Sequence, residues 1–127
     1  MTDVVTLQLP RDRDFFGVAH LVLGGLGARF DLTYDVLDDM TTALDELLEQ
    51  REAFDDVTLE VEIGDNEIRT TVGPFGGRVV DELHASDAGL GLRRVLETVV
   101  DKVSISERDS GHWVELRKHI EAMPNAG

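Results

Sequence analysis

Apolar residues recur at two different periods along the first thirty positions. The stretch VVTLQL alternates apolar and polar residues up to Pro10 and predicts a first strand. Residues 14–30 then predict an amphipathic helix, with a buried stripe of Phe15, Val18, Ala19, Val22, Leu26 and Phe30. Each of its glycines, Gly24, Gly25 and Gly27, costs about 1 kcal/mol of helix propensity relative to alanine. These glycines either allow close packing against a neighbour or loosen the helix near its end.

A second helix and a hairpin follow. Residues 34–50 predict a helix, with Thr33 as a suitable N-cap. Asp35 lies in its first turn, where a negative charge interacts favourably with the positive end of the helix dipole. Its buried stripe comprises Leu37, Met40, Leu44, Leu47 and Leu48. The period then changes from 3.6 to 2: DVTLEVEI, the turn GDNE and IRTTV predict two paired strands, with Val57, Leu59, Val61 and Ile63 facing inward.

The last third of the chain contains one irregular segment. Residues 73–88 show no clear period and predict a mobile loop, after which residues 92–100 predict a third helix. KVSISE, the turn RDSG and HWVELRK predict a closing hairpin, and residues from about 120 to 127 a frayed tail. This order predicts one α+β domain over residues 1–127, a two-layer sandwich of a mainly antiparallel mixed sheet with three helices on one face.

Charge and composition exclude several classes of protein. Against 12 Lys and Arg stand 26 Asp and Glu, a net charge of −14, so direct nucleic-acid binding is not expected. The excess of acidic side chains either attracts a basic partner or only keeps the protein soluble. The chain has no cysteine, which excludes disulfides, thiolate metal sites and cysteine catalysis. No apolar run reaches the roughly 20 residues that span a bilayer, so we expect a cytoplasmic protein without membrane contact.

Two local patterns could carry chemistry. Asp39, Thr42, Glu46 and Gln50 share one polar face of the second predicted helix. There the carboxylate of Glu46 could act on a hydroxyl and the amide oxygen of Gln50 could bind magnesium, although a solvated helix face explains the same spacing. The pair Gly89 and Gly91 precedes a helix, where it either cradles a phosphate or forms a flexible joint. The four histidines show no ligand spacing.

The stretches ALDELLEQ, TTVGPFGG, GLGLRRVLETVVDKVSIS and GHWVELRK, in this order, resemble the anti-sigma factor serine kinases of the RsbW and SpoIIAB type, within the GHKL (histidine kinase-like) ATPases. The resemblance runs from about residue 5 to 118 and implies the Bergerat-like ATPase fold. It implies that Glu46 is the catalytic glutamate, that Gln50 replaces the magnesium-binding asparagine, and that Gly89, Leu90 and Gly91 contact phosphate. The aspartate that reads adenine in the family is replaced by Gly73.

The resemblance also implies a regulatory role. Such a protein controls transcription by partner switching between a sigma factor and a STAS-domain anti-anti-sigma factor, and homodimers are common in the family. With the adenine aspartate gone, one hypothesis is an interaction module whose ATP-dependent serine kinase activity is weakened or lost. The alternatives are an active kinase that uses ATP and magnesium to phosphorylate the STAS-domain protein, and an unrelated α+β domain.

Overall fold

The computed structural model describes residues 3–50, 54–64, 66–84, 91–109 and 111–120. The chain forms five strands, four α-helices and one short 3-10 helix within these ranges. In chain order they are β1 (Asp3–Pro10), η1 (Arg13–Phe15), α1 (Phe16–Arg29), α2 (Tyr34–Leu48), β2 (Asp56–Ile63), β3 (Glu67–Phe75), α3 (Gly77–His84), α4 (Leu92–Val99), β4 (Lys102–Arg108) and β5 (Gly111–His119).

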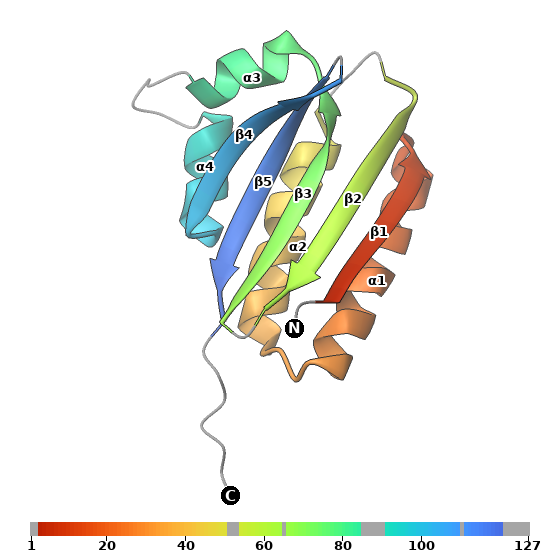
Figure 1. Ribbon diagram of the computed structural model, residues 1–127, viewed down its shortest axis with the longest axis vertical. Coiled ribbons are helices and arrows are strands. Elements are labelled where there is room, and N and C mark those ends of the chain that lie inside the picture. Colours follow the sequence, from red (N-terminus) through yellow and green to blue (C-terminus); the bar gives the residue numbers. More distant parts are fainter. Residues whose placement is uncertain (1–2, 51–53, 65, 85–90, 110, 121–127) are drawn as a thin grey trace, which may run out of the picture.

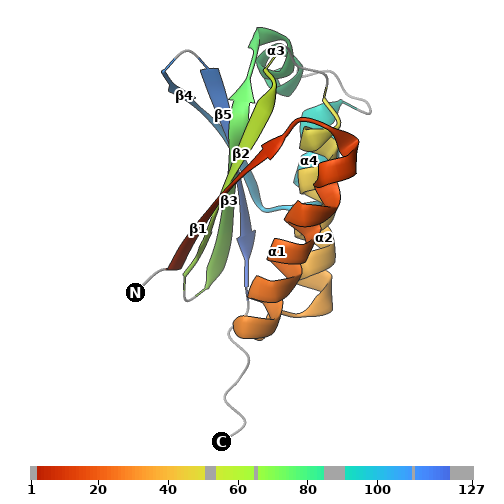
Figure 2. The same ribbon diagram turned by 90° about the vertical axis from the view of Figure 1, so that its right-hand side faces the viewer.

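The strands form one sheet in the order β1-β2-β3-β5-β4, and the helices cover one of its faces (Figures 1 and 2). This arrangement confirms the predicted two-layer α+β fold. The predicted mixed sheet is wrong, since all four strand pairings among the described residues are antiparallel. β3 and β4 run in the same direction, but β5 lies between them and pairs antiparallel with both.

The core lies between the sheet and the helices. The predicted stripe of α2 is buried at Met40, Leu44, Leu47 and Leu48, and Thr33 accepts a 3.3 Å hydrogen bond from the backbone N–H of Val36 as the N-cap. The inward residues of β2 are buried as their alternation predicts: Val57, Leu59, Val61 and Ile63. None of the helices that the structure describes lies on the opposite face of the sheet (Figure 2).

The predicted mobile loop at residues 73–88 is wrong over most of its described part. β3 continues through Gly73 to Phe75, and residues 77–84 form α3, a fourth helix where three were predicted. Val79 and Leu83, four residues apart, are fully buried and hold one side of α3 against the core. Residues 85–88 lie outside the described residues.

Two smaller predictions also need correction. In α1 the buried residues are Ala19, Leu23 and Gly27, whereas Phe15 and Val18, predicted as core, are exposed. The frayed tail does not start at residue 120, because Ile120 is buried and its N–H donates a 2.8 Å hydrogen bond to the carbonyl of Asn66. The rest of that tail lies outside the described residues.

Candidate functional site

The end of α2 and the start of α4 lie at the same end of the molecule (Figure 1). At the other end of α4, Lys118 fixes the height of the two helices relative to each other. Its Nζ donates to Asp39 Oδ2 of α2 at 2.8 Å and to the carbonyl of Val99, the last residue of α4, at 2.9 Å. From this contact α2 runs toward its C-terminal end and α4 toward its N-terminal end, because the two helices are antiparallel (Figure 1). Eight residues along either helix rise about 12 Å, which brings Gly91 level with Glu46 and its neighbours. The fold therefore brings two of the predicted site residues to one height.

The carboxylate of Glu46 is unpaired among the described residues. The side chain is half-buried, and it makes no hydrogen bond or ion pair with any residue that the structure describes. The other polar residues of this face differ from it: Asp39 is paired with Lys118, and Thr42 is exposed. A carboxylate that is half-buried and unpaired can accept a hydrogen bond or a proton from a hydroxyl brought to it.

Gln50 lies two residues beyond the end of α2. Its Nε2 donates a 3.0 Å hydrogen bond to the backbone carbonyl of Glu46, so the side chain caps the last turn of its own helix. This bond uses the amide nitrogen and leaves Oε1 as an acceptor, the kind of oxygen that magnesium takes as a ligand. The described residues contain no cluster of three or more His, Cys, Asp or Glu side chains that would hold a metal by themselves.

Gly91 is the N-cap of α4 and is exposed. Its φ of −64° and ψ of 156° are open to any residue, so the backbone conformation does not require glycine here. A Cβ built on Gly91 would meet no described atom within 4 Å. The first turn of an α-helix has free backbone N–H groups that suit an anion, and no described atom occupies the space beside Gly91 at the start of α4. Gly89 and Leu90 lie outside the described residues.

Gly73 is in a different environment. A Cβ at this position would lie 2.5 Å from Cδ2 and 2.7 Å from Cγ of Trp113, so the indole covers the Cα closely. Val114 and Leu116 of β5 pack inward, so the alternation along the strand puts the side chain of Trp113, an odd position, on the face without helices. The position that the resemblance assigns to an adenine-reading carboxylate thus has no room for one.

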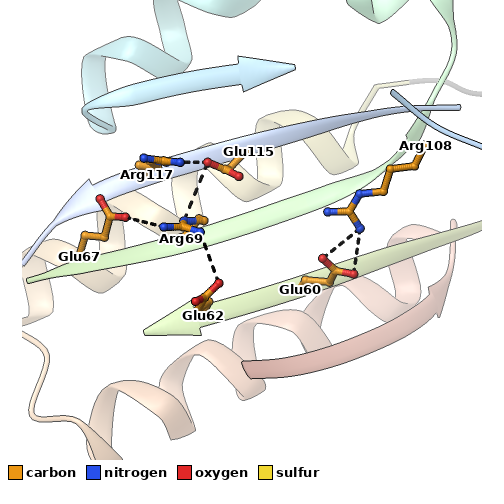
Figure 3. A network of polar contacts seen from close by, with 7 residues as sticks. All are labelled: Glu60, Glu62, Glu67, Arg69, Arg108, Glu115 and Arg117. Carbon is orange, nitrogen blue, oxygen red and sulfur yellow. Dashed lines mark hydrogen bonds and ion pairs between the residues drawn. The ribbon is translucent and has the colours of Figure 1, made fainter. Parts of the chain in front are cut away.

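The face without helices is covered by charged side chains (Figure 3). Arg69 lies among three acids, 3.1 Å from Glu67, 3.5 Å from Glu62 and 3.9 Å from Glu115. The hydrogen bond to Glu67 and the charges of the other two raise the pKa of Arg69 above its ordinary value, against the effect of desolvation. Figure 3 also shows Arg108 paired with Glu60, at 3.1 Å. The Arg108 guanidinium stacks 4.6 Å above the ring of Trp113 and so holds the indole over Gly73.

Sequence reasoning did not single out Trp113, which covers Gly73, or Lys118, which ties α2 to the far end of α4. For Lys118 a signal was present, because it follows the buried Val114 and Leu116 at the period of a strand and therefore faces the helices. For Trp113 the alternation of inward and outward residues along β5 predicts on which face of the sheet the indole lies, but it does not predict that the indole covers Gly73 of β3. His20 forms a 2.6 Å contact with Asp45 between α1 and α2.

The chain is similar to several serine-protein kinases named RsbW. It is 26% identical to the Bacillus velezensis protein and 27% identical to the Bacillus subtilis protein, in both cases over 93% of this chain and 86% of the relative. Identity to the Listeria monocytogenes protein is 27%, over 94% of this chain and 89% of the relative. No model of a known protein family matches the chain.

A solved structure shares the fold. The crystal structure of the RsbU and RsbW domains of a Mycobacterium tuberculosis protein superposes with a TM-score of 0.67 at 14% identity. The match covers 93% of this chain and 32% of the larger one, so the chain spans about a third of that protein's length. None of the helices in the described part of the chain is long and apolar enough to cross a membrane.

Proposed function

Because the chain is a divergent member of the RsbW type, we propose that it is an anti-sigma regulatory protein whose ATP-dependent serine kinase activity is weakened or lost. In this proposal it controls transcription by exchanging a sigma factor for a STAS-domain anti-anti-sigma protein. The exchange depends on binding surfaces and does not need the chemistry to be retained. The acidic chain, at −14, favours basic surfaces on its partners.

The packing of Trp113 on Gly73 carries the proposal. Recognition of adenine needs an acceptor for its amino group, and the indole occupies the space of any side chain at that position. The loss of a hydrogen bond to a charged group typically weakens binding by about 1.5–3 kcal/mol, roughly a factor of ten to a hundred in affinity. The amide oxygen of Gln50 is thus suited to a magnesium ion on the phosphates of a nucleotide, whereas position 73 offers no acceptor for the adenine base.

A specific observation favours an active serine kinase as the second candidate. The carboxylate of Glu46 is unpaired among the described residues, Gln50 keeps Oε1 as an acceptor, and the start of α4 is uncovered at the same height. In this alternative Glu46 acts on the hydroxyl of a serine in the STAS-domain protein, with ATP and magnesium held by Gln50 and by Gly89, Leu90 and Gly91.

Thermal unfolding with and without ATP and magnesium separates the two candidates. A ligand at 100 times its Kd adds about 2.7 kcal/mol of stability, which is several degrees in Tm for a domain of this size. Under the main proposal, millimolar nucleotide leaves Tm nearly unchanged. A rise of several degrees that Gly91→Glu abolishes would instead support the active kinase.

Phosphotransfer to a STAS-domain protein tests the role of Glu46. The matched control is Thr42→Ala, on the same face of α2 and exposed. If wild type and Thr42→Ala transfer phosphate and Glu46→Ala does not, the chain is an active kinase. Transfer that survives in Glu46→Ala removes that residue from the mechanism. Binding of the purified chain to neither a sigma factor nor a STAS-domain protein would contradict the regulatory role.

A further inference from the structure

Glu60 differs from the other paired glutamates on the face of the sheet without helices (Figure 3). Three of those glutamates lie around Arg69, in the middle of the sheet. Glu60 of β2 instead pairs with Arg108 alone among the described residues, and this arginine is the last residue of β4. β3 and β5 lie between β2 and β4, so the side chain of Arg108 extends over two strands to reach its partner.

Trp113 lies beneath the Arg108 guanidinium on this path. Its indole packs on Gly73, where no side chain separates the ring from the backbone, and Cζ of Arg108 lies 4.6 Å over the ring centroid. The strand below therefore fixes the ring, and its outer face is a preformed surface for a cation. The ring of Trp113 and the carboxylate of Glu60 together form a site for a planar cation, called the guanidinium site below.

Arg108 occupies the guanidinium site with few of its donors. Nη1 lies 3.1 Å from both carboxylate oxygens of Glu60, whereas Nε and Nη2 make no hydrogen bond within the described part of the chain. A guanidinium that arrives from solvent can place two N–H groups on the two oxygens in parallel, which is the stronger geometry. The side chains of Arg108 and Glu60 are 43% and 33% exposed, and ion pairs with this exposure are held weakly.

We propose that the guanidinium site binds an arginine side chain of a basic partner protein, which displaces Arg108. The internal occupant shows which chemical group the site accepts. The net charge of −14 attracts a partner of the opposite sign. Arg108 lies between Glu107 and Asp109, both exposed, so its displaced guanidinium stays close to negative charge in water.

The place of the site on the molecule favours a protein over a small molecule. The guanidinium site lies on an open sheet face, where free arginine finds only one ring and one carboxylate to contact. A partner protein adds contacts around the arginine and excludes water from it, which is how buried arginines become the strongest points of an interface. This inference rests on the fold and not on the regulatory function proposed above.

The internal arginine lowers the affinity for the partner. The apparent Kd rises by the reciprocal of the fraction of molecules in which the site is open. An exposed ion pair and an exposed cation–π contact together keep Arg108 in place in about nine molecules of ten. Removal of the Arg108 side chain should therefore lower the apparent Kd about tenfold.

Tryptophan emission measures this exchange, because Trp113 is the single tryptophan of the chain. The probe is a short peptide of glycine and serine around one arginine. Arg108→Ala is expected to show a saturable change in emission, and wild type the same change with a Kd about tenfold higher. The matched control is Lys102→Ala, which removes another exposed cation of β4 and should bind like wild type.

Three outcomes of this titration would overturn the proposal. One is an Arg108→Ala variant whose emission does not respond to the peptide. Another is a wild type that binds as tightly as Arg108→Ala, because the internal arginine then does not occupy the site. The third is a wild type that never responds, because Arg108 is then not displaced.

The carboxylate of Glu60 is tested in the Arg108→Ala background. Adding Glu60→Gln keeps the shape of the side chain and is expected to weaken peptide binding tenfold or more. The matched control adds Glu107→Gln, which removes the same charge from an exposed neighbour on β4 and should weaken binding less than twofold. Equal weakening by the two changes would mean that the net charge alone attracts the peptide, and the assigned site would be wrong.

The chemistry of the ligand is tested with related probes on Arg108→Ala. Citrulline in place of the arginine keeps the shape without the charge and is expected to abolish binding. Lysine should bind severalfold more weakly, because a compact ammonium neither stacks on the ring nor forms two parallel hydrogen bonds. A lysine peptide that binds equally would contradict the preference for guanidinium. Free L-arginine that binds as tightly as the peptide would assign the site to a small molecule and not to a partner protein.

Discussion

Gly73 and Gly91, both assigned to a nucleotide by the family resemblance, differ in what surrounds their Cα atoms. At Gly73 an indole fills the space of a side chain, whereas at Gly91 that space contains no described atom. Glycine therefore serves internal packing at the first position and leaves a helix start uncovered at the second. A glycine in a motif can thus mark either a ligand or a neighbouring ring, and only the surroundings distinguish them.

The largest expected effect is that of an aspartate at the packed glycine. Gly73→Asp places a carboxylate against Trp113 and should lower the free energy of unfolding by about 3 kcal/mol or more, since overpacking and desolvation add. Urea denaturation measures this loss. The control is Gly91→Asp, where aspartate is a favoured N-cap and stability should be unchanged or higher by a few tenths of a kcal/mol. Equal effects of the two substitutions would mean that the two glycines do not differ.

A smaller effect should appear as coupling between Gly73 and Trp113. Gly73→Ala in wild type forces the indole aside and is expected to cost about 1–3 kcal/mol. In a Trp113→Ala background the same change should cost at least 1 kcal/mol less, which a double-mutant cycle by urea denaturation detects. Additive effects would show that the indole does not cover Gly73 in solution.

The same contrast can be tested within α1. Gly24→Ala should stabilise the chain by about 0.5–1 kcal/mol, because the helix gains propensity where no described atom is displaced. Gly27→Ala should be less stable than Gly24→Ala by about 1–2 kcal/mol, since its methyl group meets Leu37. Thermal unfolding gives both values. If Gly27→Ala is as stable as Gly24→Ala, Leu37 moves freely to accept it.

The smallest effect is expected at the open glycine. Gly91→Ala should lower the free energy of unfolding by about 0.5 kcal/mol, because alanine is a somewhat poorer N-cap than glycine. Urea denaturation checks this value. A loss as large as that of Gly73→Ala would mean that the start of α4 is packed rather than open.

The sequence predicts well those helices and strands whose signals lie within the element itself, such as a cap or a periodic apolar stripe. Thr33 caps α2 and the leucine stripe of that helix faces the core, because both signals are local. α3 was missed because glycine and proline directly precede it, and these residues usually mark loops. Its buried pair Val79 and Leu83 is too short a pattern to predict a helix without the core that it packs on.

The candidate site could be predicted only in part, for the same reason. The helical positions of Glu46 and Gly91 follow from the local sequence, and their common height follows from the antiparallel packing of α2 and α4. The contact between Gly73 and Trp113 joins residues forty positions apart through the pairing of β3 with β5. No local pattern contains that information.

Trp113 is the single tryptophan of the chain. Its emission therefore comes from one place, the surface between Arg108 and Gly73 at the end of the sheet where the candidate site lies. The protein therefore carries an optical probe on the face without helices, opposite to the face on which α2 and α4 lie. A change in the stacking of Arg108 or in the cover over Gly73 would quench or shift this emission, so unlabelled protein and a fluorimeter suffice to follow this contact.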